Sequence, residues 1–261
     1  MKKFTVIARP DEISEELRLR TIADLKKNGY EYDADYPDYC FVIGGDGTFI
    51  YAVHSILRKH KGDLDKVMFY GIHTGTLGFY TDYLDTEYDE FMETFLSGTC
   101  KVITYPLLQV EYDGHMHNAI NEIRVENSSR TQLIDVYVNG EKFETFRGTG
   151  LCVCTQLGST AYNRSLGGAV IQEGLDFIEM TEMAGIHHSK YRSLEAPIIL
   201  KGDTELEFRS PSFHNAIIGC DADVYRIDEV TSIRIHVCRT ASVHMLRGRQ
   251  VSYFDRLKSL F

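Results

Sequence analysis

The sequence predicts an α/β domain followed by a β-rich, sandwich-like domain. The chain has 261 residues, which at roughly 150 residues per domain suggests about two domains. The first hundred residues alternate short apolar runs with stretches of helical period. Such alternation predicts a parallel, Rossmann-like sheet with crossover helices. From about residue 100 the apolar period becomes two, which is typical of antiparallel β-structure.

The amino-terminal domain is expected to span residues 1–100. Its apolar runs predict strands, and apolar residues three or four apart predict the helices between them. The stripe from Leu84 to Leu96 is the clearest helical pattern, and it ends at Gly98. In chain order the expected elements are a strand at 3–8, a helix from 11 to 29, a strand at 39–43, a helix through 49–57, a strand at 67–72 and a helix through 84–96.

The carboxy-terminal domain, residues 101–261, is expected to be mostly antiparallel and to bind the substrate. Two dipeptides, Asp113-Gly114 and Asn139-Gly140, are strong hairpin signals because strand-like residues flank them. The other expected elements are strands at 205–209 and 233–237, short helices near 159–165 and 176–184, and a terminal helix over 252–261 that would pack back on the first domain.

The composition excludes several classes of function. Lys and Arg number 28 against 38 Asp and Glu, a formal net charge of -10, which excludes a nucleic-acid binder with a basic face and argues against an anionic membrane surface. No apolar run approaches the roughly 18 residues of a membrane-spanning helix. The apolar start of the chain ends at Arg9, too early for a signal peptide. The six cysteines form no C-x-x-C pair, so we expect reduced thiols in a cytoplasmic protein.

A glycine-rich turn, Gly44-Gly45-Asp46-Gly47-Thr48, follows the second predicted strand. At the carboxyl end of a parallel strand it would present backbone N–H groups and a helix amino terminus to phosphate. A carboxylate repels phosphate, so Asp46 would either hold a divalent cation or accept a proton from an attacking hydroxyl. The alternative is a plain strand-to-helix turn in which Asp46 is the helix N-cap.

A second glycine-rich loop, Gly71–Tyr80, follows the next strand and is expected at the same edge of the sheet. Its three glycines at positions 71, 75 and 78 suggest close approach of the backbone to a ligand. His73 is a candidate ligand or acid, although a packed loop histidine is the commoner case. Phe79 and Tyr80 would either stack on a base or belong to the core.

Two further groups of polar residues lie in the second half. Asn121-Glu122 stands among apolar residues, where polar groups are costly to bury without partners. Its donors and acceptors suit hydrogen bonds to a purine base and a ribose. The alternative is that the pair lies in solvent at the edge of a hairpin. Residues 148–163 carry no charge and are flanked by Arg147 and Arg164. Their glycines and hydroxyls, placed before a short helix, predict either an anion-binding loop or a plain loop over the β-domain.

Together these motifs resemble those of the NAD kinase family. Gly44–Thr48 alone is shared with diacylglycerol and sphingosine kinases, but its combination with Gly75–Phe79, Asn121-Glu122 and Gly158–Asn163 is much more specific. The resemblance covers most of the chain, to about Asp221. It implies phosphoryl transfer from ATP, or in some members from inorganic polyphosphate, to the 2′-hydroxyl of the adenosine ribose of NAD. It also implies NAD bound in the cleft between the domains, and a homotetramer or homodimer.

The resemblance implies roles for individual residues. Asp46 would be the general base on the 2′-hydroxyl, and Gly44, Gly45 and Gly47 would bind phosphate. A divalent cation, Mg²⁺, would be required, with ligands that the sequence does not identify. The residues implied to bind NAD are Asp46, Gly47, Phe79, Asn121, Glu122, Arg147, Thr149, Leu157, Thr160, Ala161, Tyr162, Asn163, Arg164, Ser165 and Ala184.

Some positions are typical of one branch of the family and others depart from it. The motif variants that contain His73 and Asn163 are similar to those of the short bacterial members of the family. Thr149 stands where the family usually has Asp, and Gln156 stands where it usually has Pro. By the resemblance, Thr149 would affect the contact with the nicotinamide half of the ligand, and therefore the affinity or the preference between NAD and NADH.

Two other functions remain open at this level. A lipid kinase of the diacylglycerol type would share Gly44–Thr48, but it would not need Asn121-Glu122. A nucleotide-sensing protein with a degenerate site would account for Thr149 and Gln156.

Overall fold

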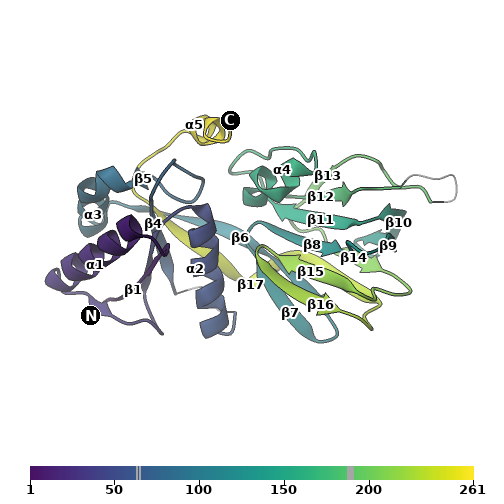
Figure 1. The fold of residues 1–261 in the computed structure, drawn as a ribbon, viewed down its shortest axis with the longest axis horizontal. Helices are drawn as coiled ribbons and strands as arrows, with labels where there is room; N and C mark the ends of the chain where they lie inside the picture. The colour runs from purple at the N-terminus through teal and green to yellow at the C-terminus, as the bar shows by residue number, and fades with distance from the viewer. Residues whose placement is uncertain (63, 65, 187–190) are drawn as a thin grey trace. The chain divides into compact units, whose positions relative to one another are not determined.

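The computed structural model describes residues 1–62, 64, 66–186 and 191–261, and these form two compact units (Figure 1). Unit 1 comprises Met1–Tyr105 together with Thr240–Phe261, and unit 2 comprises Pro106–Arg239. The second unit is therefore an insertion in the chain of the first. The chain passes between the units within two long strands, β6 (Lys101–Tyr112) and β17 (Ser232–Arg247).

Unit 1 contains a parallel sheet in the order β17-β4-β3-β1-β2, with β5 also paired to β4. The carboxy-terminal half of β17 contributes His244 and Met245 to the pairing with β4. This sheet confirms the predicted α/β class. The strands are β1 (Lys3–Ala8), β2 (Glu31–Tyr32), β3 (Tyr39–Ile43), β4 (Met68–His73) and β5 (Tyr83–Leu84).

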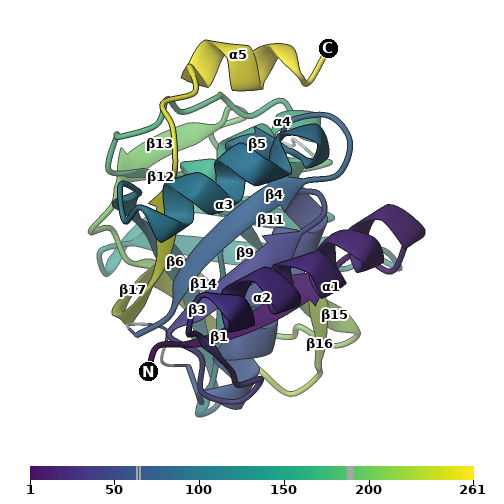
Figure 2. The same ribbon diagram turned by 90° about the vertical axis from the view of Figure 1, so that its left-hand side faces the viewer.

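Helices cover both faces of this sheet (Figures 1 and 2). Phe69 and Tyr70 are neighbours in β4 and so point to opposite faces. Tyr70 stacks on Phe91 of α3 with ring centroids 4.2 Å apart, and α1 packs on the same core. Phe49 of α2 packs against Phe69, with centroids 5.7 Å apart. The helices of this unit are α1 (Glu12–Lys27), α2 (Asp46–Lys59), a 3-10 turn at Asp85–Glu87, α3 (Tyr88–Leu96) and α5 (Tyr253–Lys258).

Unit 2 is β-rich, as predicted, and its strand pairing is antiparallel. One sheet has the order β13-β12-β11-β8-β15-β16, and the other strands form β10-β9-β14-β17 and the hairpin β6-β7. The strands are β7 (His115–Ala119), β8 (Glu122–Glu126), β9 (Gln132–Val138), β10 (Glu141–Gly148), β11 (Gly150–Thr155), β12 (Phe177–Met183), β13 (Ile198–Lys201), β14 (Leu206–Arg209), β15 (Ala216–Cys220) and β16 (Asp223–Ile227). Two short helical segments follow β11, a 3-10 turn at Leu157–Thr160 and α4 (Tyr162–Ser165).

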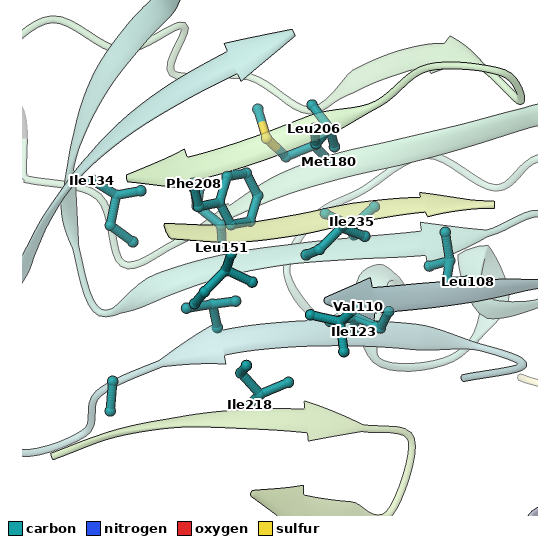
Figure 3. Packing of buried hydrophobic residues seen from close by; sticks show 14 of the residues in the cluster. Leu108, Val110, Ile123, Ile134, Leu151, Met180, Leu206, Phe208, Ile218 and Ile235 are labelled. Carbon is teal, nitrogen blue, oxygen red and sulfur yellow. The ribbon is translucent and has the colours of Figure 1, made fainter. Parts of the chain in front are cut away.

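The core of unit 2 lies between these sheets (Figure 3). Phe208 of β14 and Ile235 of β17 enter it from one side. Leu151 of β11, Ile123 of β8 and Ile218 of β15 enter from the other. All five side chains are fully buried, and truncating one such residue to Ala typically costs about 2–5 kcal/mol. This packing holds β8 and β11 in place. Candidate site residues lie at the start of β8 and directly after the end of β11.

Both predicted hairpins are present. Asp113 and Gly114 join β6 to β7 with φ angles of 44° and 77°. Asn139 and Gly140 join β9 to β10 with φ angles of 50° and 84°. Two consecutive residues with positive φ form the type I′ turn that matches the twist of paired strands.

Two predictions about single elements were wrong. Residues 176–184 do not form a helix, because Phe177–Met183 is the strand β12, paired on both sides. Both of its faces are covered, since Glu179 and Thr181 are as buried as its apolar residues, and this hides the two-residue period. Helix α3 begins at Tyr88 rather than near Leu84, because Tyr83–Leu84 pairs with β4.

The cysteines and helices agree with the expectations from composition. All six cysteines, each within the described residues, are free thiols. Within the described part of the chain, no helix is both long enough and apolar enough to cross a membrane.

Candidate active site

The turn from β3 into α2 places Asp46 at the start of a helix. Gly44 has a φ of 150°, and a side chain there would meet Thr48. Gly45 is the helix N-cap, and Asp46 is the first helical residue. The interpretation of Asp46 as an N-cap is therefore wrong, and its carboxylate has other partners.

The loop after β4 holds the Asp46 carboxylate through backbone N–H groups. Phe79 N donates to Oδ1 and Oδ2 at 3.1 and 3.0 Å, and Tyr80 N donates to Oδ1 at 3.3 Å. A side chain at Gly78 would overlap the same carboxylate, so glycine is required at this close approach. Asp46 is half-buried, and these backbone donors fix the direction of its carboxylate.

The ring of His73 packs beside this turn. A Cβ built on Gly45 would lie 3.4 Å from its Nε2 atom. Burial lowers the pKa of His73, and the nearby Asp46 only partly opposes this. Its Nδ1 is buried and has no hydrogen-bond partner among the described residues. The imidazole is therefore neutral at pH 7, which favours packing over the role of an acid.

The rings of Phe79 and Tyr80 belong to the core rather than to a stacking surface. Phe79 is 7% exposed and meets Tyr253 edge-on, with centroids 6.2 Å apart. Tyr80 is 5% exposed and stacks on Phe49 at 4.9 Å. The backbone of this loop, and not its rings, faces Asp46.

In unit 2, the Asn121-Glu122 pair lies at the start of β8 and is fixed by Asp221. The Asp221 carboxylate accepts from the backbone N–H groups of Ile120, Asn121 and Glu122 at 2.8, 2.8 and 3.1 Å. Gly158 packs so closely against the Asn121 carbonyl that any side chain there would overlap it. The segment after β11 is thereby seated directly against the pair.

Glu122 is an unusual carboxylate. It is 6% exposed, and burial together with the neighbouring Asp221 raises the pKa of Glu122 to about 7, although Arg124 and the backbone of Tyr162 act in the opposite direction. Within the described residues, its Oε2 atom has no hydrogen-bond partner. A buried, unpaired carboxylate oxygen is costly, and a ligand hydroxyl would satisfy it.

The segment from Leu157 to Ser165 uses several of its polar groups internally. Thr160 Oγ1 donates to the Leu157 carbonyl at 3.0 Å. Asn163 is fully buried, and its Nδ2 donates to Glu179 at 2.8 Å. The predicted binding residues that stay open to a ligand are the half-buried Ala161 and Tyr162 and the exposed Arg164 and Ser165.

Arg147, Thr149 and Ala184 form a second group at the other end of β11. Thr149 N donates to the Met183 carbonyl at 2.9 Å, and Ala184 has a φ of 47°. The six residues of β11 separate this group from the segment that begins at Leu157, a span of roughly 3.3 Å per residue. Within unit 2, the predicted NAD-binding residues therefore fall into two places.

Sequence reasoning missed the residues that support the site. Asp221 and Glu179 touch predicted site residues through hydrogen bonds. The available signal was a charged residue inside an apolar strand, which is costly unless paired, as at Glu179 in β12.

A divalent cation would need ligands from outside the chain. Among the described residues, no three or more His, Cys, Asp or Glu side chains are grouped to hold a metal ion. Mg²⁺ is commonly held by one or two carboxylates plus substrate phosphates rather than by an all-protein cage.

Comparison with known proteins agrees with this geometry. The family model for the ATP-NAD kinase C-terminal domain matches residues 120–246. An NAD kinase of Limosilactobacillus reuteri is 33% identical over 96% of this chain and 96% of its own. NAD kinase 1 of Listeria monocytogenes is 35% identical, over 97% and 99% respectively.

Solved structures share the fold. Yeast NADH kinase complexed with NADH has a TM-score of 0.82 at 17% identity, covering 100% of this chain and 86% of its own. An NAD kinase from Archaeoglobus fulgidus in complex with ATP has a TM-score of 0.79 at 21% identity, covering 99% of each chain.

An α/β unit that bears the Gly44–Thr48 turn, together with an inserted β-rich unit, defines a class of phosphoryl-transferring kinases. Near-complete coverage at 33–35% identity then decides the branch within that class. This chain belongs to the NAD kinase family.

Proposed function

We propose that this enzyme transfers a phosphoryl group from ATP to the 2′-hydroxyl of the adenosine ribose of NAD, producing NADP. The observation that carries the proposal is the Asp46 carboxylate, which the Phe79 and Tyr80 backbone fixes beside a glycine turn. The full-length similarity to NAD kinases favours this function over a lipid kinase or a nucleotide sensor.

Asp46 acts as the general base in this proposal. A ribose hydroxyl is a weak nucleophile at neutral pH, so removal of its proton during attack lowers the barrier. Phosphoryl transfer otherwise depends on alignment and charge neutralisation. The two N–H donors restrict rotation of the carboxylate, which supports in-line positioning of the attacking oxygen.

The residues proposed to contact NAD are those of the expected set that have an exposed or unpartnered polar group. Gly44, Gly45 and Gly47 would bind phosphate through backbone N–H groups at the start of α2. The Oε2 atom of Glu122, which lacks a partner within the described residues, would accept a hydrogen bond from a ribose hydroxyl. Arg164 offers an exposed cation to an anionic ligand.

Mg²⁺ would enter with ATP, bound mainly by the nucleotide phosphates and water. When bound, the cation would neutralise charge that develops on the transferring phosphoryl group.

The proposed setting is the cytoplasm, and the proposed assembly is a homotetramer or homodimer. Six free thiols support a reducing compartment. Sedimentation equilibrium of the purified chain, with and without NAD, measures the assembly directly.

A coupled assay for NADP formation tests the function. NAD and NADH are each offered with ATP or polyphosphate, with and without Mg²⁺. The expected result is Mg²⁺-dependent NADP formation. Binding of NAD without product would support the sensor, and phosphorylation of diacylglycerol in vesicles would support the lipid kinase.

A further inference from the structure

A buried cluster in unit 1 joins the loop after β4 to the end of the chain. Asp82 is 2% exposed, Arg247 is 8% exposed and Arg256 is 4% exposed. The Asp82 carboxylate accepts from Arg247 Nη1 at 3.1 Å, from Gly248 N at 2.9 Å and from Arg256 Nη2. Buried charges persist only when they are paired and hydrogen-bonded, so this cluster is a fixed part of the unit.

The same two guanidinium groups bind the carbonyls of the loop that holds Asp46. Arg256 Nη1 donates to the Gly78 carbonyl at 2.7 Å. Arg247 Nη2 donates to the Phe79 carbonyl at 3.0 Å. Each side chain therefore contacts both the Asp82 carboxylate and the backbone of the loop, and Arg256 Nη1 also donates to the Thr81 carbonyl.

The peptide groups of the Gly78 and Phe79 carbonyls are the ones whose N–H groups hold Asp46. The Gly78 carbonyl and the Phe79 N–H belong to one peptide group, and the Phe79 carbonyl and the Tyr80 N–H belong to the next. In a trans peptide the C=O and N–H point in opposite directions. Each group thus has an arginine on its oxygen and the Asp46 carboxylate on its nitrogen.

Such an arrangement strengthens and directs both hydrogen bonds. A cation on a carbonyl oxygen polarises the amide and makes its N–H a stronger donor. The rigid peptide plane also transmits position, because the loop cannot tilt without breaking an arginine contact. The effect on Asp46 passes through the loop, whose carbonyls Arg247 and Arg256 bind.

We propose that Arg247 and Arg256 are positioning residues for phosphoryl transfer, which hold the Asp46 carboxylate through the Gly78–Phe79 and Phe79–Tyr80 peptide groups. This inference rests on the proposed function, in which Asp46 is the general base. Neither arginine touches the substrate in this role. Their removal should therefore act on turnover, and only while Asp46 is present.

A double-mutant cycle tests the proposal. Arg256→Gln is expected to lower kcat by about 10–100-fold in the wild-type background, with KM for NAD within about threefold. In the Asp46→Asn background the same change is expected to lower the remaining kcat by less than about threefold. Equal fold-losses in the two backgrounds would overturn the proposal, because a general structural defect is additive.

Two further variants separate positioning from folding. Arg249→Gln removes an arginine of the same segment, which pairs with Glu87 and binds the Asp82 carbonyl but no carbonyl at 78–79. It is expected to keep kcat within about twofold of wild type. Arg256→Lys keeps the charge but not the two-nitrogen geometry, and it is expected to recover part of the kcat lost in Arg256→Gln. If Arg256→Gln does not fold, Arg247→Gln carries the same double-mutant cycle, because Arg247 binds the Phe79 carbonyl.

Hydrogen exchange gives a readout that does not depend on activity. The Phe79 and Tyr80 amides are expected to exchange at least about tenfold faster in Arg256→Gln than in wild type, while the Arg249→Gln amides match wild type. Unchanged exchange would overturn the positioning role even in an active enzyme. A wild-type chain that makes no NADP would instead overturn the proposed function and leave the exchange result to decide the positioning role.

Discussion

The Asp46 carboxylate has two backbone donors, and a single substitution there separates binding from chemistry. Asp46→Asn keeps the size of the side chain but removes the proton acceptor. We expect turnover to fall by about 10²-fold or more, while the Kd for NAD changes little because the glycine turn is intact. Rapid-quench turnover and calorimetric titration measure the two quantities.

The matched control for this change is Asp113→Asn. Asp113 lies in a hairpin turn with a φ of 44°, a conformation that asparagine also adopts readily. The turnover of Asp113→Asn should equal that of wild type. Near-normal turnover in Asp46→Asn would contradict the role of general base.

Glu122 makes stability depend on pH. The pKa of its carboxyl is about 7 in the folded chain and 4.5 in the reference state. As pH rises through this interval the unfolded chain loses its proton first, so wild-type stability falls, by up to about 3 kcal/mol. The Glu122→Gln side chain does not titrate, so the free energy of unfolding of this variant should not show this decrease with pH. Urea unfolding of both proteins without ligand, at pH 5 and pH 8, measures the difference.

Glu87 provides a control of opposite sign. Its hydrogen bonds with Arg249 lower the pKa of Glu87, so its contribution to stability is present above its unfolded pKa and is lost as pH falls. Glu87→Gln should therefore cost more stability at pH 8 than at low pH. Identical pH profiles for Glu122→Gln and wild type would refute the raised pKa.

The sequence predicted residues whose chemistry is visible in a short motif, and Asp46 is the clear case. It could not predict that Asn163 points inward, because its partners Glu179 and Thr181 lie 16 and 18 residues away in a strand. Arg256 is more distant still, 178 residues from the carbonyl that it binds. Contacts of this kind follow from tertiary packing and leave no local pattern.

At the scale of elements, α4 is a four-residue helix that depends on one buried side chain for its place. Asn163 Nδ2 donates to Glu179, and its Oδ1 accepts from Thr181 at 2.7 Å. Asn163→Ala would leave both partners buried and unsatisfied, so we expect a loss of about 2–3 kcal/mol in the free energy of unfolding. Chemical denaturation followed by circular dichroism measures it.

Ser165→Ala tests the same helix without the buried contact. Ser165 is exposed, and we expect its substitution to change stability by less than about 0.5 kcal/mol. Equal losses in the two variants would mean that the buried hydrogen bonds do not hold α4.

Strands were predictable where a short apolar run ends at a turn residue, as at Pro10 after β1 and Gly44 after β3. β1 and β3 have the predicted bounds, and both hairpin turns lie at the predicted dipeptides. β12 failed because neighbours cover both of its faces, which leaves no alternation to read. The apolar period of a strand reflects which of its side chains are exposed to water. In β12, side chains on both faces are buried, so the sequence lacks that period.

At the scale of the whole molecule, unit 1 is assembled from two distant stretches of chain. The fragment 1–105 lacks β17, which is one of the strands that pair with β4, and both arginines of the Asp82 cluster. We expect this fragment to be unfolded, because Asp82 would be buried without a counter-charge. Far-ultraviolet circular dichroism and thermal melting measure this.

Rejoining the stretches should restore the unit. Thr104 Oγ1 and His244 Nδ1 lie 2.9 Å apart, so a flexible linker of about eight residues can connect 105 to 240. The joined chain should melt cooperatively. A fragment 1–105 that melts equally well alone would show that the cluster is dispensable for folding.

The two-part fold class was predictable from the change of apolar period near residue 100. The return of the chain to unit 1 at Thr240 rests on β17, a single strand whose two halves belong to different units. The burial alternation along this strand is interrupted at residues 236–240, next to the division, but a local irregularity of this kind does not reveal that the two halves belong to different units.

The insertion of unit 2 sets an order of events during synthesis. The ribosome makes the Gly44–Thr48 turn early, but it makes Arg247 and Arg256 only after the whole of unit 2. At about 5–20 residues per second this interval is on the order of ten seconds. A nascent chain interrupted within that interval would carry the Asp46 carboxylate without the two arginine side chains that bind the carbonyls of its loop. The loop after β4 can therefore gain these contacts only late in synthesis.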